Sequence, residues 1–297
     1  MKVIHLLATD KFSGAENVAC QIINVSKEEK NTEVYYCSLK GEIEDTLKEK
    51  EINFIGLKKF SLKEINKVIN EYKPDVIHVH DYKASLLVAV SRFKGKIISH
   101  LHNNCPDVTS WTIKSILYSL VIKRFDHIVG VSQKVYDEAI FKNKMKNKFT
   151  KIYNYVDKKR VINLSLEKKI NNRYDIFFIG RLTEQKDPIR FIEIISLLKE
   201  KNKKINAVMI GDGHLKEKCQ DKIKELSLEN NIEMVGFCSN PFPIIKNCKI
   251  GIMPSVWEGF GLTAIEAMCL NRPVFNSGVG GLGEIFENNQ EYICNTN

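Results

Sequence analysis

The sequence predicts an α/β protein with doubly wound parallel sheets, because short apolar runs alternate with longer amphipathic stretches along the whole chain. Apolar runs typical of buried strands lie at residues 1–8, 33–38, 76–80, 96–100 and 127–131. Helical patterns between them supply the crossovers that parallel strands need, and the first helix is predicted over residues 16–26. At 297 residues, of which 43% are hydrophobic, the chain can bury two moderate cores.

The same alternation of apolar runs and amphipathic stretches continues in the second half, which predicts a second domain of the same class. Strands are expected at residues 175–179, 206–210, 232–235, 249–253, 273–276 and 292–294. Pro254 ends the fourth of these strands, and Gly259 and Gly261 allow a sharp turn into a helix that begins near Leu262. The expected organisation is a domain at 1–157, a charged and polar linker at 158–173, and a domain at 174–297.

Two carboxylates lie on either side of that turn. Glu258 is on the loop, and Glu266 lies about one turn inside the helix. The helix N-terminus presents free amide groups beside them, so the segment suits an anionic ligand that carries hydroxyl groups. The alternative is an ordinary strand-to-helix connection with two solvated glutamates.

Two cations follow the strand at 175–179. Arg181 and Lys186 are five positions apart, directly after Gly180. At the carboxyl end of a strand such a pair can hold a diphosphate, with the arginine as a planar fork and the lysine as a point charge. Taken alone, they are better interpreted as two surface cations.

These segments occur in one order with a set of further glycine motifs. The pattern consists of Gly180-Arg181-Leu182 with Lys186, Gly211-Asp212-Gly213, the Glu258 and Glu266 pair, and Gly280-Gly281 before Glu284. Together they resemble the nucleotide-sugar-dependent glycosyltransferases of the large retaining family four, of group 1 type. The resemblance covers nearly the whole chain and implies the GT-B fold, in which two Rossmann-like domains face a central cleft. The family usually continues with helices that return to the first domain, so we expect this chain to be short at its C-terminus.

The resemblance implies a hexosyltransferase-type activity. A sugar would pass, with retention, from a nucleoside diphosphate sugar, UDP-linked, to a hydroxyl of a glycan or lipid-linked acceptor in capsule, exopolysaccharide or lipopolysaccharide synthesis. Arg181 and Lys186 would neutralise the diphosphate, Glu266 would bind the ribose, and Glu258 would contact the sugar. The other nucleotide-sugar contacts that the resemblance implies are Gly14, Gly211, Gly236, Phe237, Gly259, Phe260, Gly261 and Leu262.

Histidines gather at the ends of two predicted strands. They are His78 and His80, followed by Asp81, and then His100 and His102. A metal site is disfavoured because strand alternation turns the first two histidines to one face and Asp81 away from it. The resemblance implies that His102 lies near the transferring sugar and helps the reaction, with His100 as the competing choice.

No cofactor is expected. The run Gly278-Val279-Gly280-Gly281-Leu282-Gly283 fits the dinucleotide pattern, but only fourteen residues follow it, too few for the acidic residue that this fingerprint needs. There is no Asp-x-Asp motif, so no metal is expected either. The eight cysteines are scattered without metal-ligand spacing, which is typical of reduced thiols.

The net charge of +9 is concentrated in the first half, where residues 1–157 hold 25 Lys and Arg against 19 Asp and Glu. Lysines between residues 114 and 151 alternate with apolar side chains from Trp111 onward. This pattern indicates either an anionic membrane surface as partner or a solvated lysine-rich face. No nucleic-acid motif accompanies the charge. No apolar stretch is long enough for a membrane span, so a cytoplasmic protein, peripheral on the inner face of the membrane, is expected.

Two other functions remain open from the sequence. A sugar-nucleotide epimerase or hydrolase of the same architecture would use the same diphosphate clamp, and products formed from the donor alone would reveal it. A non-catalytic nucleotide-sugar-binding or membrane-docking module would form no product.

Overall fold

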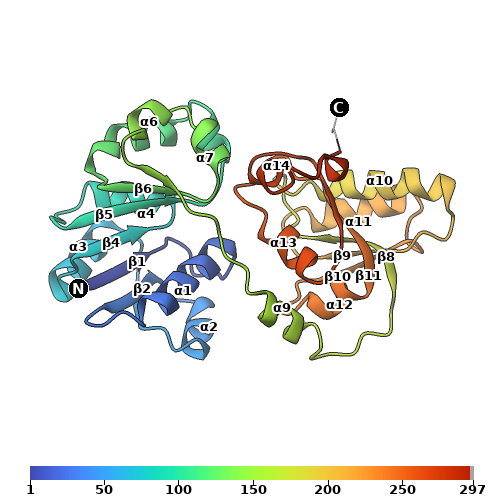
Figure 1. Ribbon diagram of the computed structural model, residues 1–297, viewed down its shortest axis with the longest axis horizontal. Coiled ribbons are helices and arrows are strands. Elements are labelled where there is room, and N and C mark those ends of the chain that lie inside the picture. Colours follow the sequence, from blue (N-terminus) through green and yellow to red (C-terminus); the bar gives the residue numbers. More distant parts are fainter. Residues whose placement is uncertain (295–297) are drawn as a thin grey trace. The chain divides into compact units, whose positions relative to one another are not determined.

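The computed structural model describes residues 1–294. The chain forms two compact units, and it passes from the first to the second between Asn154 and Tyr155, three residues before the expected boundary. Each unit is a parallel sheet flanked by helices, coloured blue to green in the first unit and green to red in the second (Figure 1).

The first unit holds a seven-stranded parallel sheet in the order β3-β2-β1-β4-β5-β6-β7. Its strands are β1 (Lys2–Leu6), β2 (Glu33–Leu39), β3 (Phe54–Leu57), β4 (Val76–Val79), β5 (Lys96–Leu101), β6 (His127–Gly130) and β7 (Phe149–Lys151). Its helices are α1 (Gly14–Ser26), α2 (Ile43–Glu49), α3 (Leu62–Tyr72), α4 (Tyr82–Ala89), α5 (Pro106–Thr109), α6 (Ile113–Val121), η1 (Ile122–Arg124), α7 (Gln133–Asp137) and α8 (Lys142–Met145). The strand order reverses between β1 and β4, so loops diverge at their carboxyl ends.

Two edge strands of this sheet were missed by the sequence pattern. Strand β3 has four residues, and β7 has three, two of which are exposed. Runs this short carry too few apolar residues for a period-two signal.

The second unit holds a five-stranded parallel sheet in the order β10-β9-β8-β11-β12. Its strands are β8 (Tyr174–Ile179), β9 (Ala207–Ile210), β10 (Ile232–Gly236), β11 (Cys248–Met253) and β12 (Val274–Asn276). Its helices are α9 (Lys158–Leu164), α10 (Pro188–Lys201), α11 (Lys216–Glu225), α12 (Phe242–Lys246), α13 (Leu262–Cys269), α14 (Gly281–Ile285) and η2 (Gln290–Tyr292). The strand predicted at 292–294 is wrong: a short helical turn is followed by a single bridge from Ile293 to Asn276.

Both faces of the second sheet are buried, as the continuous apolar strands predict. Phe177 packs in one core with residues of α9, α12 and α13, whereas its neighbours Ile176 and Phe178 pack in another with residues of α10 and α11. Helix α9 therefore belongs to the second unit, although it starts inside the expected linker at 158–173. Asp157 caps this helix by accepting a hydrogen bond from the backbone N–H of Arg160 at 3.0 Å.

Candidate functional site

The carboxyl ends of β8 and β11 are the point where the second sheet changes its winding direction. From β8, the chain builds β9 and β10 on one side, and then β11 and β12 on the other. Loops diverge at such a point, which is where open α/β sheets bind ligands. The loops that follow β8, β9 and β11 carry most of the residues selected from the sequence.

The loop after β8 is pressed against the loop after β9, and two glycines allow this contact. A Cβ on Gly211, which has a φ of 143°, would lie 1.9 Å from the carbonyl oxygen of Gly180. A Cβ on Gly213 would lie 2.4 Å from the carbonyl oxygen of Leu182. The first role of these glycines is therefore to let the two loops approach, which fixes the backbone on either side of Arg181.

Gln185 ties the loop after β8 to the loop after β11. Its side-chain oxygen accepts a hydrogen bond from Arg181 Nη2 at 3.1 Å, and its Nε2 donates to the carbonyl of Trp257 at 3.3 Å. The backbone N–H of Val256 donates to the Gln185 carbonyl at 2.9 Å. Sequence reasoning missed this residue, because a glutamine between two charged motifs carries no signal of its own.

Lys186 and Glu258 form an ion pair across the same two loops. Both side chains are mostly buried, with 14% and 13% of their surface exposed. The resemblance implied that the lysine binds a diphosphate and that the glutamate contacts a sugar, and nothing in the sequence pattern predicted that the two side chains meet. Each group thus compensates the other's charge when no ligand is bound.

The turn from β11 into α13 is supported by the glycine segment that fits a dinucleotide pattern. Gly281 donates its N–H to the Glu258 carbonyl at 2.8 Å, and a Cβ on Gly281 would lie 2.4 Å from the carbonyl oxygen of Gly259. Gly261 caps the helix with a φ of 104°, a conformation that favours glycine. Phe260 is buried beneath this turn, and Leu262 begins the helix. The glycine segment thus shapes the Glu258 loop.

Glu266 lies in the second turn of α13. Burial raises the pKa of its carboxyl to about 7, partly offset by the positive charge of Arg160 on α9. A carboxylate with this pKa is only half ionised near neutral pH, and hydrogen bonds from ligand hydroxyls would favour its ionised form.

The loop after β10 is open. Gly236 has a φ of 74°, and its carbonyl accepts a hydrogen bond from the N–H of Gly211 at 2.8 Å. The next residue, Phe237, leaves 76% of its surface exposed. This arrangement offers an aromatic ring beside the loop after β9.

In the first unit, five histidines lie on one face of the sheet, where its strand order reverses. They are His5 on β1, His78 and His80 at the end of β4, and His100 and His102 at the end of β5. Burial lowers the pKa of His102 to about 3 and that of His78 to about 4, and it lowers the pKa values of the other three as well. All five imidazoles are therefore neutral at physiological pH.

Nitrogen atoms of this cluster approach one another closely enough to suggest a metal centre. Two triads, His5-His78-His80 and His80-His100-His102, each have three ring nitrogens within 4.8 Å. The rings, however, are stacked: the planes of His78 and His80 differ by 23°, and those of His100 and His102 by 25°. Nitrogen lone pairs lie in the ring plane, so stacked rings direct them side by side instead of toward one ion.

Asp81 takes no part in this cluster. Its carboxylate accepts hydrogen bonds from the N–H groups of Ala84 at 2.8 Å and Ala8 at 2.7 Å, which caps α4 and ties it to the end of β1. This agrees with the expectation that the side chain turns away from the histidines.

Gly14 is the first residue of α1, and its φ is not positive. The helix is capped by Ser13, whose N–H donates to the buried carboxylate of Glu16 at 3.1 Å. No strained turn thus requires a glycine at this position. The absence of a side chain still leaves the N-terminus of α1 uncovered there.

Two protein families match this chain, one mainly over the first unit and the other over the second. Residues 40–160 match the family described as Glycosyltransferase Family 4, and residues 161–297 match the family described as Glycosyl transferases group 1. An uncharacterised glycosyltransferase of Methanocaldococcus jannaschii, MJ1059, is 33% identical over 237 residues, which are 72% of this chain and 58% of that protein. The O-antigen biosynthesis glycosyltransferase WclY of Escherichia coli is 25% identical over 305 residues, covering 97% of this chain and 83% of that protein.

The fold is shared with solved structures. The crystal structure of Anabaena HepE in complex with UDP and glucose matches with a TM-score of 0.78 at 21% identity, covering 96% of this chain and 83% of HepE. The two units and their parallel sheets thus have the GT-B fold that the resemblance implied. In three archaeal and bacterial relatives, the matches span 58%, 66% and 65% of the relative's own length.

Proposed function

Because this chain belongs to the group 1 glycosyltransferases, we propose that it transfers a sugar from a UDP-linked donor to a hydroxyl of a glycan or lipid-linked acceptor, with retention at the anomeric carbon. The observation that carries the proposal lies at the carboxyl ends of β8 and β11, where Lys186 pairs with Glu258 and Gln185 holds the side chain of Arg181. The printed names of relatives add support: WclY acts in O-antigen biosynthesis, and the HepE structure contains UDP and glucose.

The charged site residues of the second unit each have a proposed role in this reaction. Arg181 and Lys186 stabilise the negative charge that develops on the diphosphate as the sugar leaves, together with the amides at the start of α13. Electrostatic stabilisation of this kind is typically worth about 3 kcal/mol per hydrogen-bond donor. Glu266 accepts hydrogen bonds from the ribose hydroxyls, and Glu258 contacts the sugar once the diphosphate has taken its place beside Lys186.

Gly236 and Phe237 are proposed to hold the nucleotide base. The backbone groups of this loop can read the edge of a base, and the exposed ring of Phe237 can stack on its face. In the first unit, His102 is proposed to hydrogen-bond a hydroxyl of the transferring sugar, and Gly14 to leave room for the ligand at the N-terminus of α1.

This proposal includes no metal or other cofactor, because Arg181 and Lys186 are proposed to neutralise the diphosphate. We expect transfer to retain at least half of its rate in about 5 mM EDTA, which is far in excess of trace metal ions and removes divalent cations from solution. Product mass spectrometry with and without EDTA measures this. Complete loss of transfer that magnesium or manganese restores would contradict the expectation.

A lipid-linked acceptor would be membrane-bound, which agrees with an unusual surface on α6. The buried side chains of this helix are Ser115, Tyr118 and Ser119. Apart from Lys114, its exposed side chains are apolar: Ile113 and Leu120 leave 79% and 66% of their surface exposed, and Ile116 and Leu117 leave 45% each. A surface helix of a water-soluble domain normally buries its apolar side chains and exposes its polar ones, whereas α6 does the opposite. Together with Trp111, which is 68% exposed, these four residues form the α6 surface.

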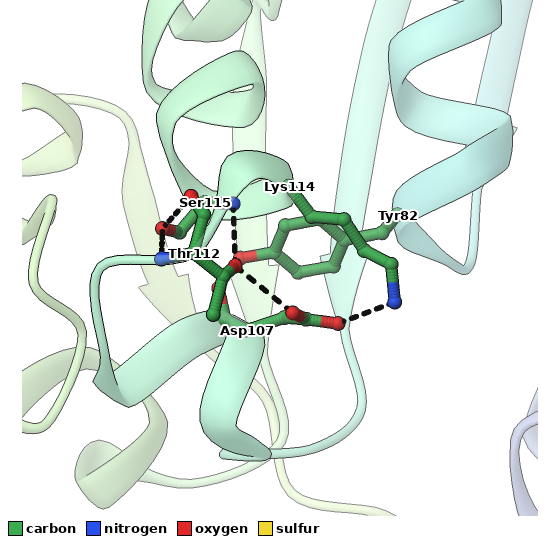
Figure 2. A network of polar contacts seen from close by, with 5 residues as sticks. All are labelled: Tyr82, Asp107, Thr112, Lys114 and Ser115. Carbon is green, nitrogen blue, oxygen red and sulfur yellow. Dashed lines mark hydrogen bonds and ion pairs between the residues drawn. The ribbon is translucent and has the colours of Figure 1, made fainter.

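A polar network fixes the start of α6 in this orientation (Figure 2). Asp107 accepts hydrogen bonds from the hydroxyl of Thr112 at 2.9 Å and from the ammonium of Lys114 at 2.8 Å, and its carbonyl accepts one from Tyr82 at 2.9 Å. Thr112 in turn caps the helix by accepting from the N–H of Ser115 at 3.1 Å. The apolar residues are thus held outward by the fold.

Cations surround the other end of the helix. Lys144 donates to the carbonyl of Ser119 at 3.4 Å, and Lys148 donates to the carbonyl of Lys123 at 3.2 Å. Apolar side chains flanked by lysines are complementary to the interface of an anionic bilayer, where each cation contributes about 1 kcal/mol. We therefore propose peripheral binding to the inner face of the membrane. Among residues 1–294, no helix is both long and apolar enough to cross a bilayer.

Replacing Ile113 and Leu120 together with serine is expected to weaken binding to anionic phosphatidylglycerol vesicles at least about tenfold, because two apolar side chains no longer enter the lipid. Vesicle co-sedimentation measures this. Leu197→Ser on α10 is the matched control, since that leucine is 63% exposed in the second unit. Equal loss in the control, or equal binding to neutral phosphatidylcholine vesicles, would refute the proposal.

A further inference from the structure

Three of the five clustered histidines form a hydrogen-bonded chain. His5 Nδ1 lies 2.9 Å from His80 Nε2, and His80 Nδ1 lies 2.9 Å from His102 Nε2. We propose that His80 and His5 are positioning residues that determine which ring nitrogen of His102 carries its proton. The inference rests on the proposed role of His102 as a contact of the transferring sugar.

The chain couples the tautomers of its members. A neutral imidazole has one N–H donor and one acceptor nitrogen, and each nitrogen-to-nitrogen contact needs one proton. If His80 donates from Nδ1, it must accept at Nε2, so His5 and His102 both carry their proton on Nδ1 as well. If His80 instead donates from Nε2, all three carry the proton on Nε2. Mixed arrangements leave one contact with two protons or with none.

Burial keeps this coupling intact at physiological pH. His5 and His80 are 1% and 2% exposed, and the low pKa values of the chain's members exclude a second proton on any ring. Solvent therefore cannot replace one of these contacts at low cost, because a buried nitrogen without a partner loses about 1–3 kcal/mol.

The chain ends at a nitrogen that has no partner in the structure. His102 Nδ1 is buried and makes no hydrogen bond within the described residues. A sugar hydroxyl can donate or accept there, and the tautomer decides which of the two it does. The orientation of the hydroxyl at the reacting sugar is thus linked to a histidine on β1, two strands away in the sheet.

His78 is a natural control, because it shares the stack but not the chain. Its ring lies 4.3 Å from that of His80, and its Nε2 has no hydrogen-bond partner among residues 1–294. A phenylalanine at position 78 or at position 80 keeps an aromatic ring in the stack, but only at position 80 does it break the chain.

Nitrogen-15 NMR of the histidine side chains in the unliganded 297-residue chain tests the coupling directly. The expected result is that His5, His80 and His102 share one tautomer, and that His80→Phe changes the tautomer or broadens the signals of His102 whereas His78→Phe does not. Mixed tautomers in the unmodified protein would overturn the proposal, whether or not any variant folds.

Turnover separates this proposal from the proposed function. His80→Phe is expected to lower kcat for sugar transfer about tenfold, the equivalent of one ordinary hydrogen bond, while UDP affinity stays unchanged and His78→Phe stays within about threefold. An altered His102 tautomer without loss of turnover would uphold the chain and remove His102 from the proposed sugar site. An equal fall of kcat in both variants would show a packing effect only, and would overturn the positioning role.

Discussion

Lys186→Ala is expected to weaken the binding of free UDP about 100-fold. The diphosphate loses a charge-assisted hydrogen bond, and Glu258 is left as a mostly buried carboxylate without its counter-charge beside the incoming anion. Isothermal titration calorimetry of UDP measures the change. The expectation follows from the ion pair, because the diphosphate has to take the place of Glu258 at the lysine.

Glu258→Gln is the matched variant, and it should not weaken the binding of UDP. Lys186 no longer has a carboxylate partner, so UDP affinity should stay the same or rise a few-fold. Sugar transfer should nevertheless fall at least about 100-fold, since the contact with the sugar loses its charge. Comparable losses of UDP affinity in the two variants would refute the separate roles of the two side chains.

Glu266→Gln is expected to stabilise the second unit at pH 8 by up to about 3 kcal/mol. The folded state holds the pKa of this carboxyl at about 7, above its ordinary value of 4.5, and each pKa unit corresponds to about 1.4 kcal/mol. Between these values the folded state binds a proton that the unfolded state releases. Stability is therefore lost as the pH rises through 7, and a neutral amide avoids this loss.

Urea unfolding of the variant and the unmodified chain at pH 4.5 and pH 8 measures the effect. The two proteins should have nearly equal stability at the lower pH and should differ at the higher one. Glu229→Gln, at an exposed carboxylate of the same unit, serves as the control and should show no such difference. A constant difference at both pH values would contradict the raised pKa. The same Glu266→Gln variant should bind UDP about tenfold more weakly, because the ribose hydroxyls lose an ionised acceptor.

The sequence predicted the central strands of both sheets because these strands are buried on both faces and are continuously apolar. It predicted neither β3 nor β7, which are short edge strands, and it placed a strand at 292–294 where a single bridge forms. The predicted end of the strand at 175–179 was sufficient to place Arg181 and Lys186 at the carboxyl edge of the second sheet. The resemblance, and not the spacing, assigned them to a diphosphate.

Contacts between distant segments were beyond the sequence pattern. The pair Lys186 and Glu258 is 72 residues apart, and the contact depends on the neighbouring positions of β8 and β11. The histidine chain likewise depends on strand register, which pairs His5 with His78, so that His80 lies two residues further along the chain on the same face. Periodicity showed that His78 and His80 share a face, but it could not show that β1 supplies a third ring to the same face.

The most direct measurement of sugar transfer is NMR of the product formed by the purified chain from a UDP-sugar, carbon-13-labelled at the anomeric carbon, and a lipid-linked glycan acceptor. We expect a new glycosidic linkage with the anomeric configuration of the donor, formed only when the acceptor is present. Release of free sugar or an isomerised nucleotide sugar from the donor alone, or a linkage of inverted configuration, would contradict the proposed reaction.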